Sequence, residues 1–180
     1  MVVMALDLGT RTGYALHRED GRIESGEARF DLKKHEGEGR RYVKFRAWLV
    51  EMKQAHPRLE RIVYEKVMGH GAFQVIAAHV YGAMLGTLQA FGEHNGIAYD
   101  GFAVTTIKKQ FSGSGRAQKV DMVNQCKALG FSPSGHNEAD AIALLHVALG
   151  RCPILTMCGA SPKKRRPKPQ PTLAPDAQPF

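Results

Sequence analysis

The sequence has little of several features that define common protein classes. Only 3 of its 180 residues are cysteine, and Cys126, Cys152 and Cys158 lack the paired spacing of zinc ligands. An odd number of cysteines without such spacing argues against a disulfide framework and a zinc finger, and it fits a reducing compartment, so we expect a cytoplasmic protein. No basic leader precedes the first apolar residues, and no apolar run approaches the length of a membrane span, so we expect neither secretion nor membrane insertion.

Positive charge is what the sequence has in excess. Lysine and arginine number 25 against 17 acidic residues, which gives a formal net charge of +8 and a pI near 9.6. An apolar content of 43% is enough for one domain with its own core. We place this domain at residues 1–155 and expect the basic, proline-rich segment 156–180 to be a disordered tail. The charge favours a polyanionic partner.

The apolar pattern predicts an α/β fold. Short apolar or alternating runs between turn signals predict strands at 2–6, 14–17, 21–30, 61–64 and 97–104. Helical periodicity predicts helices at 40–52, 73–91, 117–129 and 136–149. We expect Ser134 to cap the last of these helices and Gly150 to end it. The helix at 73–91 is apolar over much of its girth and contains Gly82 and Gly86, which packing on the sheet or a subunit interface would explain.

Three acidic residues stand near the ends of predicted elements. Asp7 ends the first strand, Glu65 ends the strand at 61–64, and Asp140 lies near the start of the last helix. Helical spacing puts His136 and Asn137 on the same face as Asp140. A turn at Asp7 and helix capping at Asn137 and Asp140 are the alternative explanations. If the acids converge, their oxygen atoms suit Mg²⁺ or Mn²⁺, and two such ions could support phosphodiester hydrolysis. Without metal, mutual repulsion should raise their pKa values.

A glycine-serine loop with basic neighbours precedes the predicted helix at 117–129. Its spacing does not match the Walker pattern of nucleotide-binding proteins. Its open backbone and short polar side chains suit a phosphate oxygen, and nearby cations can neutralise a DNA backbone. The candidate DNA-binding residues of this segment are Lys108, Lys109, Ser114, Arg116 and Lys119.

Four segments, in this order along the chain, resemble RuvC-type Holliday junction resolvases. They are Asp7-Leu-Gly-Thr-Arg-Thr-Gly-Tyr-Ala, Val63-Tyr-Glu65, Ser112-Gly-Ser-Gly-Arg-Ala-Gln-Lys and His136-Asn-Glu-Ala-Asp140-Ala, and the similarity covers about residues 1–150. The resemblance implies an RNase H-like fold, with a central mixed five-stranded sheet flanked by helices. It also implies a homodimer that nicks four-way DNA junctions with Mg²⁺, for which Mn²⁺ can substitute. By resemblance, Asp7, Glu65 and Asp140 would be catalytic metal ligands, Lys108 and Lys119 would contact DNA phosphates, and Arg11 is a further DNA-binding candidate.

Two positions depart from the family pattern. An acid or histidine usually stands three residues before the last aspartate, and here that position is Asn137, whose amide oxygen can bind a hard cation without adding charge. His136 is the alternative fourth ligand, or a phosphate contact. The family also has an aromatic residue shortly after the central glutamate, where this chain has Met68 and then His70 and Phe73. We therefore expect activity on other branched DNA as well as on four-way junctions.

Other interpretations remain open at this point. A YqgF-like nuclease acting on RNA would have a similar first segment, although Glu65 and the glycine-serine loop favour a resolvase. A catalytically inactive protein that binds branched DNA would fit Asn137, but the presence of all three acids argues against it. Actin-like sugar kinases and Hsp70-type ATPases share the Asp-Leu-Gly-Thr opening, yet they need two such domains, which 180 residues cannot hold.

Overall fold

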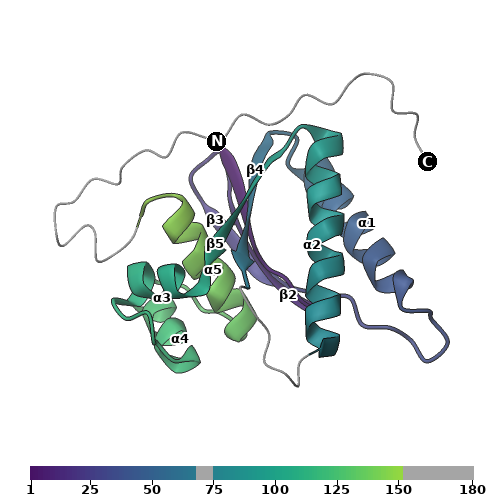
Figure 1. Ribbon diagram of the computed structural model, residues 1–180. Coiled ribbons are helices and arrows are strands. Elements are labelled where there is room, and N and C mark those ends of the chain that lie inside the picture. Colours follow the sequence, from purple (N-terminus) through teal and green to yellow (C-terminus); the bar gives the residue numbers. More distant parts are fainter. Residues whose placement is uncertain (68–74, 152–180) are drawn as a thin grey trace.

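Five strands form one mixed sheet at the centre of the molecule (Figure 1). The computed structural model describes residues 1–67 and 75–151. The central strand β1 (Val2–Asp7) is antiparallel to β2 (Arg11–His17), which is antiparallel to β3 (Ile23–Arg29). On its other side β1 is parallel to β4 (Leu59–Lys66), and β4 is parallel to β5 (Ala98–Ala103). The order β3-β2-β1-β4-β5 confirms the predicted mixed five-stranded sheet.

Helices cover both faces of this sheet and divide the core into two layers. On one face lie α1 (Gly39–Ala55) and α2 (Val75–Asn95), whose apolar residues pack with Met4 and Leu6 of β1. On the other lie α3 (Val104–Ser112), α4 (Lys119–Ala128) and α5 (His136–Ala148), which pack with Val3 and Ala5 (Figure 1). Because side chains alternate along a strand, β1 contributes to both layers and is buried along most of its length.

The segment around α3 differs from what the sequence predicted. No structure was predicted for 105–109, but α3 begins directly after β5 and turns Ile107 and Phe111 into the core, four residues apart on one face. The glycine-serine loop therefore begins only at Gly113, whose φ of 89° lies in the left-handed region where α3 ends. The loop is shorter than expected, and Lys108 and Lys109 belong to a helix.

The prediction that Ser134 caps the last helix is wrong. Gly135 occupies the capping position of α5, and no side chain caps the helix there. The Ser134 hydroxyl donates instead to the carboxylate of Glu138, 2.7 Å away, in the first turn. The predicted end of the helix is confirmed, because Gly150 follows it with a φ of 67°.

Helix α2 corrects the expectation that no apolar stretch has the length of a membrane span. It is the one helix among residues 1–67 and 75–151 that could cross a membrane by length and composition alone. That finding is weak, because core helices of soluble proteins also meet the criterion. Met84, Leu88 and Phe91 of α2 are buried in the layer that covers the sheet.

Several predictions fall on residues that the structure does not describe. These are the DNA contacts proposed for Met68, His70 and Phe73, the domain boundary at residue 155 and the tail that follows it. Cys152 and Cys158 also lie outside the described residues, whereas Cys126 is free and buried.

Candidate acidic site and basic surface

Strand alternation brings two of the predicted acids to the same face of the sheet. Val3 and Ala5 point into the layer formed by α3, α4 and α5, so Asp7 has the same orientation at the end of β1. Val63 points into that layer too, and Glu65 follows it by two residues on β4. Because β1 and β4 are parallel neighbours with Leu6 opposite Tyr64, the two carboxylates stand side by side at the carboxyl edge of the sheet.

Helix α5 delivers the third acid by lying against β2 at a glycine. A Cβ atom built on Gly13 would overlap the main-chain carbonyl of Asn137 and would lie 2.8 Å from the nitrogen of Glu138. Only glycine therefore allows the first turn of α5 to approach β2 this closely. Gly13 is also the direct partner of Asp7 in the antiparallel ladder, so the contact sets Asp140 beside the carboxyl end of β1. β2 begins at Arg11 and not at the predicted residue 14, so Gly13 lies inside the strand.

Two hydrogen-bonded contacts fix the first turn of α5 to β3. Buried Glu138 accepts hydrogen bonds from the Ser25 hydroxyl at 2.7 Å and from the backbone nitrogen of Ser134 at 2.8 Å. The amide nitrogen of Asn137 donates to Glu27 Oε2 at 3.0 Å and to the carbonyl oxygen of Arg11 at 3.1 Å. Glu138 thus points away from Asp140, as its helical spacing predicts.

Hydrogen bonding also determines the charge state of Glu138. Burial alone would raise the pKa of this carboxyl, but donation by Ser134 and Ser25 outweighs burial and lowers its pKa below the usual value. Glu138 therefore serves as a charged anchor between α5 and β3.

The three predicted acids form one electrostatic unit. Burial, and then the charges of Glu65 and Asp140, raise the pKa of Asp7 well above its usual value. Burial, followed by Asp140, raises the pKa of Glu65 to about 7. The pKa of Asp140 is raised by burial, although Lys108, Lys119 and His136 act in the opposite direction. Burial is the largest cause of all three shifts, and neighbouring carboxylates add to it at Asp7 and Glu65, which is the direction that the sequence predicts for a cluster without metal.

Donor chemistry fits a hard divalent cation, but the present arrangement is not a closed metal cage. Carboxylate oxygens are the ligands that Mg²⁺ and Mn²⁺ prefer, and a cation would relieve the repulsion at Asp7 and Glu65. Within residues 1–67 and 75–151, no three acidic, histidine or cysteine side chains are grouped closely enough to hold one ion. Because Mg²⁺ commonly keeps several waters and uses only one or two carboxylates, this cluster fits the ion when waters complete its shell.

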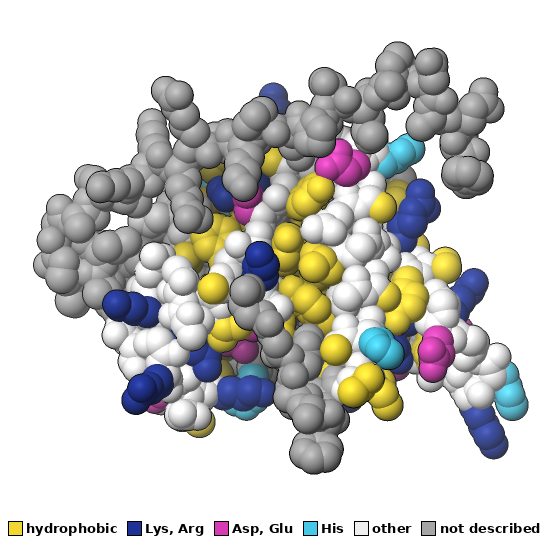
Figure 2. Space-filling view, in the orientation of Figure 1, with side chains coloured by type: hydrophobic (Ala, Val, Ile, Leu, Met, Phe, Trp, Pro, Cys, Tyr) yellow, Lys and Arg dark blue, Asp and Glu magenta, His cyan; other side chains and the backbone are white. Residues whose placement is uncertain are grey.

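Predicted DNA-binding residues surround the acids on α3 and α4, and they are not equivalent. Lys108 is partly buried and donates to the carbonyl oxygen of Ala117 at 2.8 Å, so it ties α3 to the start of α4. Lys109, Arg116 and Lys119 are exposed. Lysine and arginine side chains gather over this region of the molecular surface (Figure 2). Lys108 and Lys119 lie close enough to the acids to lower their pKa values, so positive charge stands beside the acidic cluster.

The remaining predicted residues lie at the rim of the site. His136 is exposed at the first position of α5 and lowers the pKa of Asp140. Arg11 is exposed at the start of β2, where its carbonyl accepts the bond from Asn137. Ser114 is exposed in the loop after α3, and its hydroxyl accepts a hydrogen bond from the backbone nitrogen of Arg116 at 3.3 Å.

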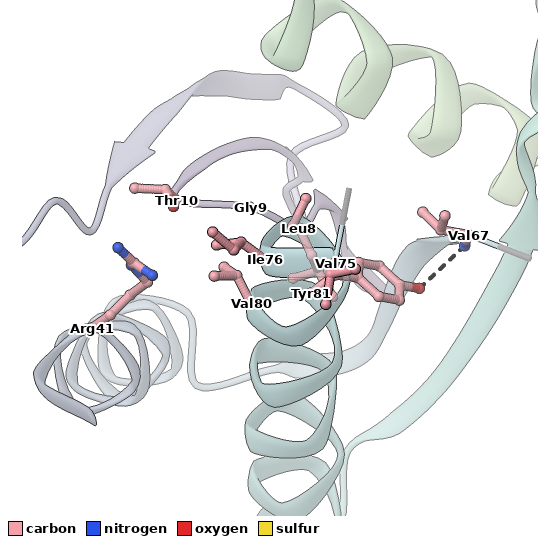
Figure 3. Close-up of a pocket in the computed structure, with 10 residues that line it drawn as sticks. Leu8, Gly9, Thr10, Arg41, Val67, Val75, Ile76, Val80 and Tyr81 are labelled. Carbon is pink, nitrogen blue, oxygen red and sulfur yellow. Dashed lines mark hydrogen bonds between the residues drawn. The ribbon is translucent and has the colours of Figure 1, made fainter. Parts of the chain in front are cut away.

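A hollow lies on the face of the sheet opposite to the acidic cluster. It has a volume of about 740 Å³ and is lined mainly by apolar side chains between the turn after β1, α1 and α2 (Figure 3). Arg41 contributes the charged group. The Tyr81 hydroxyl, at its inner end, donates to the carbonyl of Glu65 at 2.9 Å and accepts from the nitrogen of Val67 at 3.2 Å. Tyr81 thereby connects α2 to the strand end that carries Glu65.

Three residues of the site were missed by sequence reasoning. Gly13 was left outside the predicted strand at 14–17, and neither Glu27 nor Tyr81 was singled out. Gly13 lies one alternation step from Ala15, so the strand pattern could have shown that it faces α5. For Glu27 and Tyr81 no local pattern exists, because their partners are 110 and 16 residues away in the sequence.

Comparisons with solved structures identify the fold. A complex described as T. thermophilus RuvC with a Holliday junction substrate matches with a TM-score of 0.68 and 19% identity, over 84% of this chain and 95% of that one. A further Thermus thermophilus RuvC structure matches with a TM-score of 0.62 and 22% identity, over 84% and 96% of the two chains. The yeast mitochondrial Holliday junction resolvase Ydc2 matches with a TM-score of 0.54 and 13% identity, over 79% and 75%. No family model matches the sequence, and no curated protein matches it.

These matches confirm the RNase H-like fold of RuvC-type resolvases for this chain. The similarity extends over nearly the full length of both Thermus chains, so it includes the sheet and the helices that carry the acidic cluster.

Proposed function

We propose that this protein is a divalent-metal-dependent endonuclease that nicks branched DNA, with four-way junctions as its main substrate. The observation that carries the proposal is the convergence of Asp7, Glu65 and Asp140 from two neighbouring strands and one helix. The charge of Asp140 helps to raise the pKa values of both Asp7 and Glu65. The basic surface of α3 and α4 beside the cluster supplies the charge that a DNA backbone requires. The fold shared with a RuvC bound to a Holliday junction supports the choice of substrate.

Asp7, Glu65 and Asp140 would hold Mg²⁺ or Mn²⁺, with the side-chain oxygen of Asn137 or a group of His136 as a further ligand. When bound, two such ions supply an activated water and stabilise the leaving 3′ oxygen of the phosphodiester. The residues of the chain position the DNA strand: Lys119 lies near the acids and is free to meet a phosphate, while Lys108 holds the loop before α4 in place.

We further propose that the protein acts as a homodimer through α2. Val75 and Ile76 at its start are 56% and 81% exposed, which is unfavourable for large apolar side chains in water. A Cβ atom built on Gly82 or Gly86 would meet nothing within 4 Å in the described residues, so packing inside one chain does not explain these glycines. A second copy of α2 would cover the apolar surface and use the glycines for close contact. We expect this dimer to act in the cytoplasm, of a bacterium or of a phage-infected host cell.

The proposal is tested by cleavage assays on the purified full chain. Labelled four-way junction, flap, linear duplex and RNA substrates are incubated with Mg²⁺ and with chelator, and light scattering gives the mass of the protein. We expect symmetrical nicks in the junction with Mg²⁺ only, weaker cutting of the flap, and a dimer. The Asp7→Asn variant should lose cleavage by at least about 100-fold while it still binds the junction, because affinity depends on the basic side chains.

Asp20→Asn is the matched control for this experiment. Asp20 lies in the exposed turn between β2 and β3, where it pairs with Arg22 at 2.7 Å, far from the acidic cluster in the sheet. The control should cut like the unchanged protein. Normal cleavage by Asp7→Asn would remove the acidic cluster from the mechanism, and preference for RNA would favour the YqgF-like alternative.

One observation favours a second candidate function, which is the binding of branched DNA without cleavage. The acids do not form a closed metal-binding group in the described residues, and Asn137 adds no negative charge to them. This alternative predicts tight, salt-sensitive binding to junctions without nicks at any concentration of Mg²⁺ or Mn²⁺.

A further inference from the structure

The side chain of Asn137 has a defined orientation, and β3 determines it. Its amide nitrogen donates to Glu27 Oε2 at 3.0 Å and to the carbonyl oxygen of Arg11 at 3.1 Å. A carboxylate and a carbonyl can only accept hydrogen bonds, so the NH₂ group must face them and the amide oxygen must lie on the other side of the group. A flipped amide would set oxygen against oxygen at both contacts. The two bonds therefore leave Oδ1 as the atom that Asn137 offers to other partners.

Glu27 is itself held in place for this contact. Its second oxygen accepts from Arg29 Nε at 3.1 Å, and its side chain is only 17% exposed. Glu27 is the ladder partner of Gly13, and Gly13 is the partner of Asp7, so the three residues form one row across β3, β2 and β1. The backbone of Asn137 lies over the middle of this row, at Gly13. Asn137 thus contacts Glu27 through its side chain and lies through its backbone against Gly13, the ladder partner of Asp7.

We propose that Glu27 is a positioning residue that makes Asn137 a neutral metal ligand. Glu27 binds the amide nitrogen, so the amide oxygen of Asn137 is left to face the proposed metal ion. The carboxylate of Glu27, behind Asn137, adds the negative charge that an amide lacks. Partners of this kind commonly tune metal ligands from behind, and their loss costs about 10- to 100-fold in metal affinity. This inference rests on the proposed metal-dependent function and specifies which residues complete its site.

The arrangement makes an unusual prediction for Asn137→Asp. Charge alone would favour this substitution, because a carboxylate binds Mg²⁺ better than an amide does. In this structure, however, the new carboxylate would face Glu27 and the carbonyl of Arg11, so three acceptors would meet without a proton between them. The variant should bind Mg²⁺ more weakly than the unchanged protein. Adding Glu27→Gln should reverse the loss, because the glutamine amide can donate to Asp at position 137.

The test is a calorimetric titration of the full-length protein with MgCl₂, without DNA. Glu27→Ala should lower Mg²⁺ affinity about 10-fold or more, whereas Glu27→Gln, which still offers an acceptor oxygen, should lower it less. Asn137→Asp should also lower affinity, and the double variant with Glu27→Gln should recover at least the affinity of Glu27→Gln alone. Glu24→Ala is the matched control: it removes an ion pair with Arg18 (3.3 Å) from the same strand, and it should leave affinity unchanged.

Thermal melts in chelator show which variants are folded. If Asn137→Asp does not fold, the Mg²⁺ affinities of Glu27→Ala and Glu27→Gln test the inference without it. Mg²⁺ affinity in Glu27→Ala equal to that of the unchanged protein, or tighter binding by Asn137→Asp, would overturn the inference. Cleavage of junctions by a protein with that outcome would leave the proposed function intact. The expected affinity pattern without cleavage of any DNA substrate would support the role of Glu27 and refute the proposed function. Absence of Mg²⁺ binding by the unchanged protein would overturn the inference, and the cleavage assay would then decide the proposed function.

Discussion

Adding one methyl group at Gly13 should separate the acids without changing any of them. In Gly13→Ala the new Cβ would overlap the carbonyl of Asn137, and the nitrogen of Glu138, 2.8 Å away, would have to retreat by about 0.6 Å to reach an ordinary contact of 3.4 Å. Backbone atoms on both sides cannot rotate away as a side chain can, so the first turn of α5 must move as a unit. Asp140 lies in the turn that follows and moves with it.

The magnitude follows from two general costs. Overpacking of this kind destabilises a domain by about 1–3 kcal/mol. For a domain of this size that corresponds to a loss of about 5 °C in the melting temperature. Misplacement of a catalytic group by about 1 Å costs about 100-fold in rate. We therefore expect Gly13→Ala to cut four-way junctions about 100-fold more slowly in single-turnover assays, while its affinity for the junction changes little.

Two other glycines provide graded controls. In Gly26→Ala, on β3, the atoms nearest to the new Cβ would belong to the side chain of Tyr14, with the hydroxyl oxygen at 2.9 Å, and this side chain can shift. In Gly39→Ala, at the start of α1, it would meet nothing within 4 Å. Activity should decrease in the order Gly39→Ala, Gly26→Ala, Gly13→Ala. Full activity and an unchanged melting temperature in Gly13→Ala would refute the idea that this contact sets the position of Asp140.

Two further predictions concern charge. Burial, and then Asp140, raise the pKa of Glu65 from 4.5 to about 7, so this group stabilises the metal-free fold below pH 4.5 and the stabilisation is lost as the pH rises to about 7. In chelator, the free energy of unfolding should fall by up to about 3 kcal/mol across that window, and the melting temperature should fall with it. Mg²⁺ should restore the melting temperature. A melting temperature that rises with pH in the metal-free protein would contradict the assignment. Lys119→Ala should weaken junction binding and reduce the slope of log affinity against log salt by about 1, whereas Lys127→Ala at the far end of α4 should have the smaller effect. Equal slopes for Lys119→Ala and the unchanged protein would remove Lys119 from the interface.

Much of the fold could be predicted because short apolar runs and turn signals in the sequence indicate individual strands and turns. The run Val2–Leu6, the Asp20-Gly21 turn and the apolar strand before Glu65 each predict their own element, and the structure confirms all three. Helix α3 was missed because only Val104, Ile107 and Phe111 show its period, and a strand comes immediately before it. The cap of α5 was misassigned because the Ser134 hydroxyl donates to the carboxylate of Glu138, while Gly135 takes the capping position.

The acidic residues of the candidate site could be predicted from the sequence, but the contacts that position them could not. Asp7, Glu65 and Asp140 each lie near an element end, which is visible in the sequence. Their support comes from a close backbone approach at Gly13 and from a contact between Glu27 and Asn137, which are 110 residues apart. Such contacts depend on the packing of α5 on the sheet, and no sequence window contains both partners.

The hydroxyl of Tyr81 connects the proposed dimer surface on α2 to the strand that carries Glu65. One oxygen atom on α2 grips the main chain on both sides of Lys66, directly after Glu65. Any shift of α2 when two subunits associate would therefore move the end of β4, the strand that carries Glu65, a proposed metal ligand. A lone subunit and a paired one would then differ in the rate of the proposed cleavage, so association of the two subunits would control that activity.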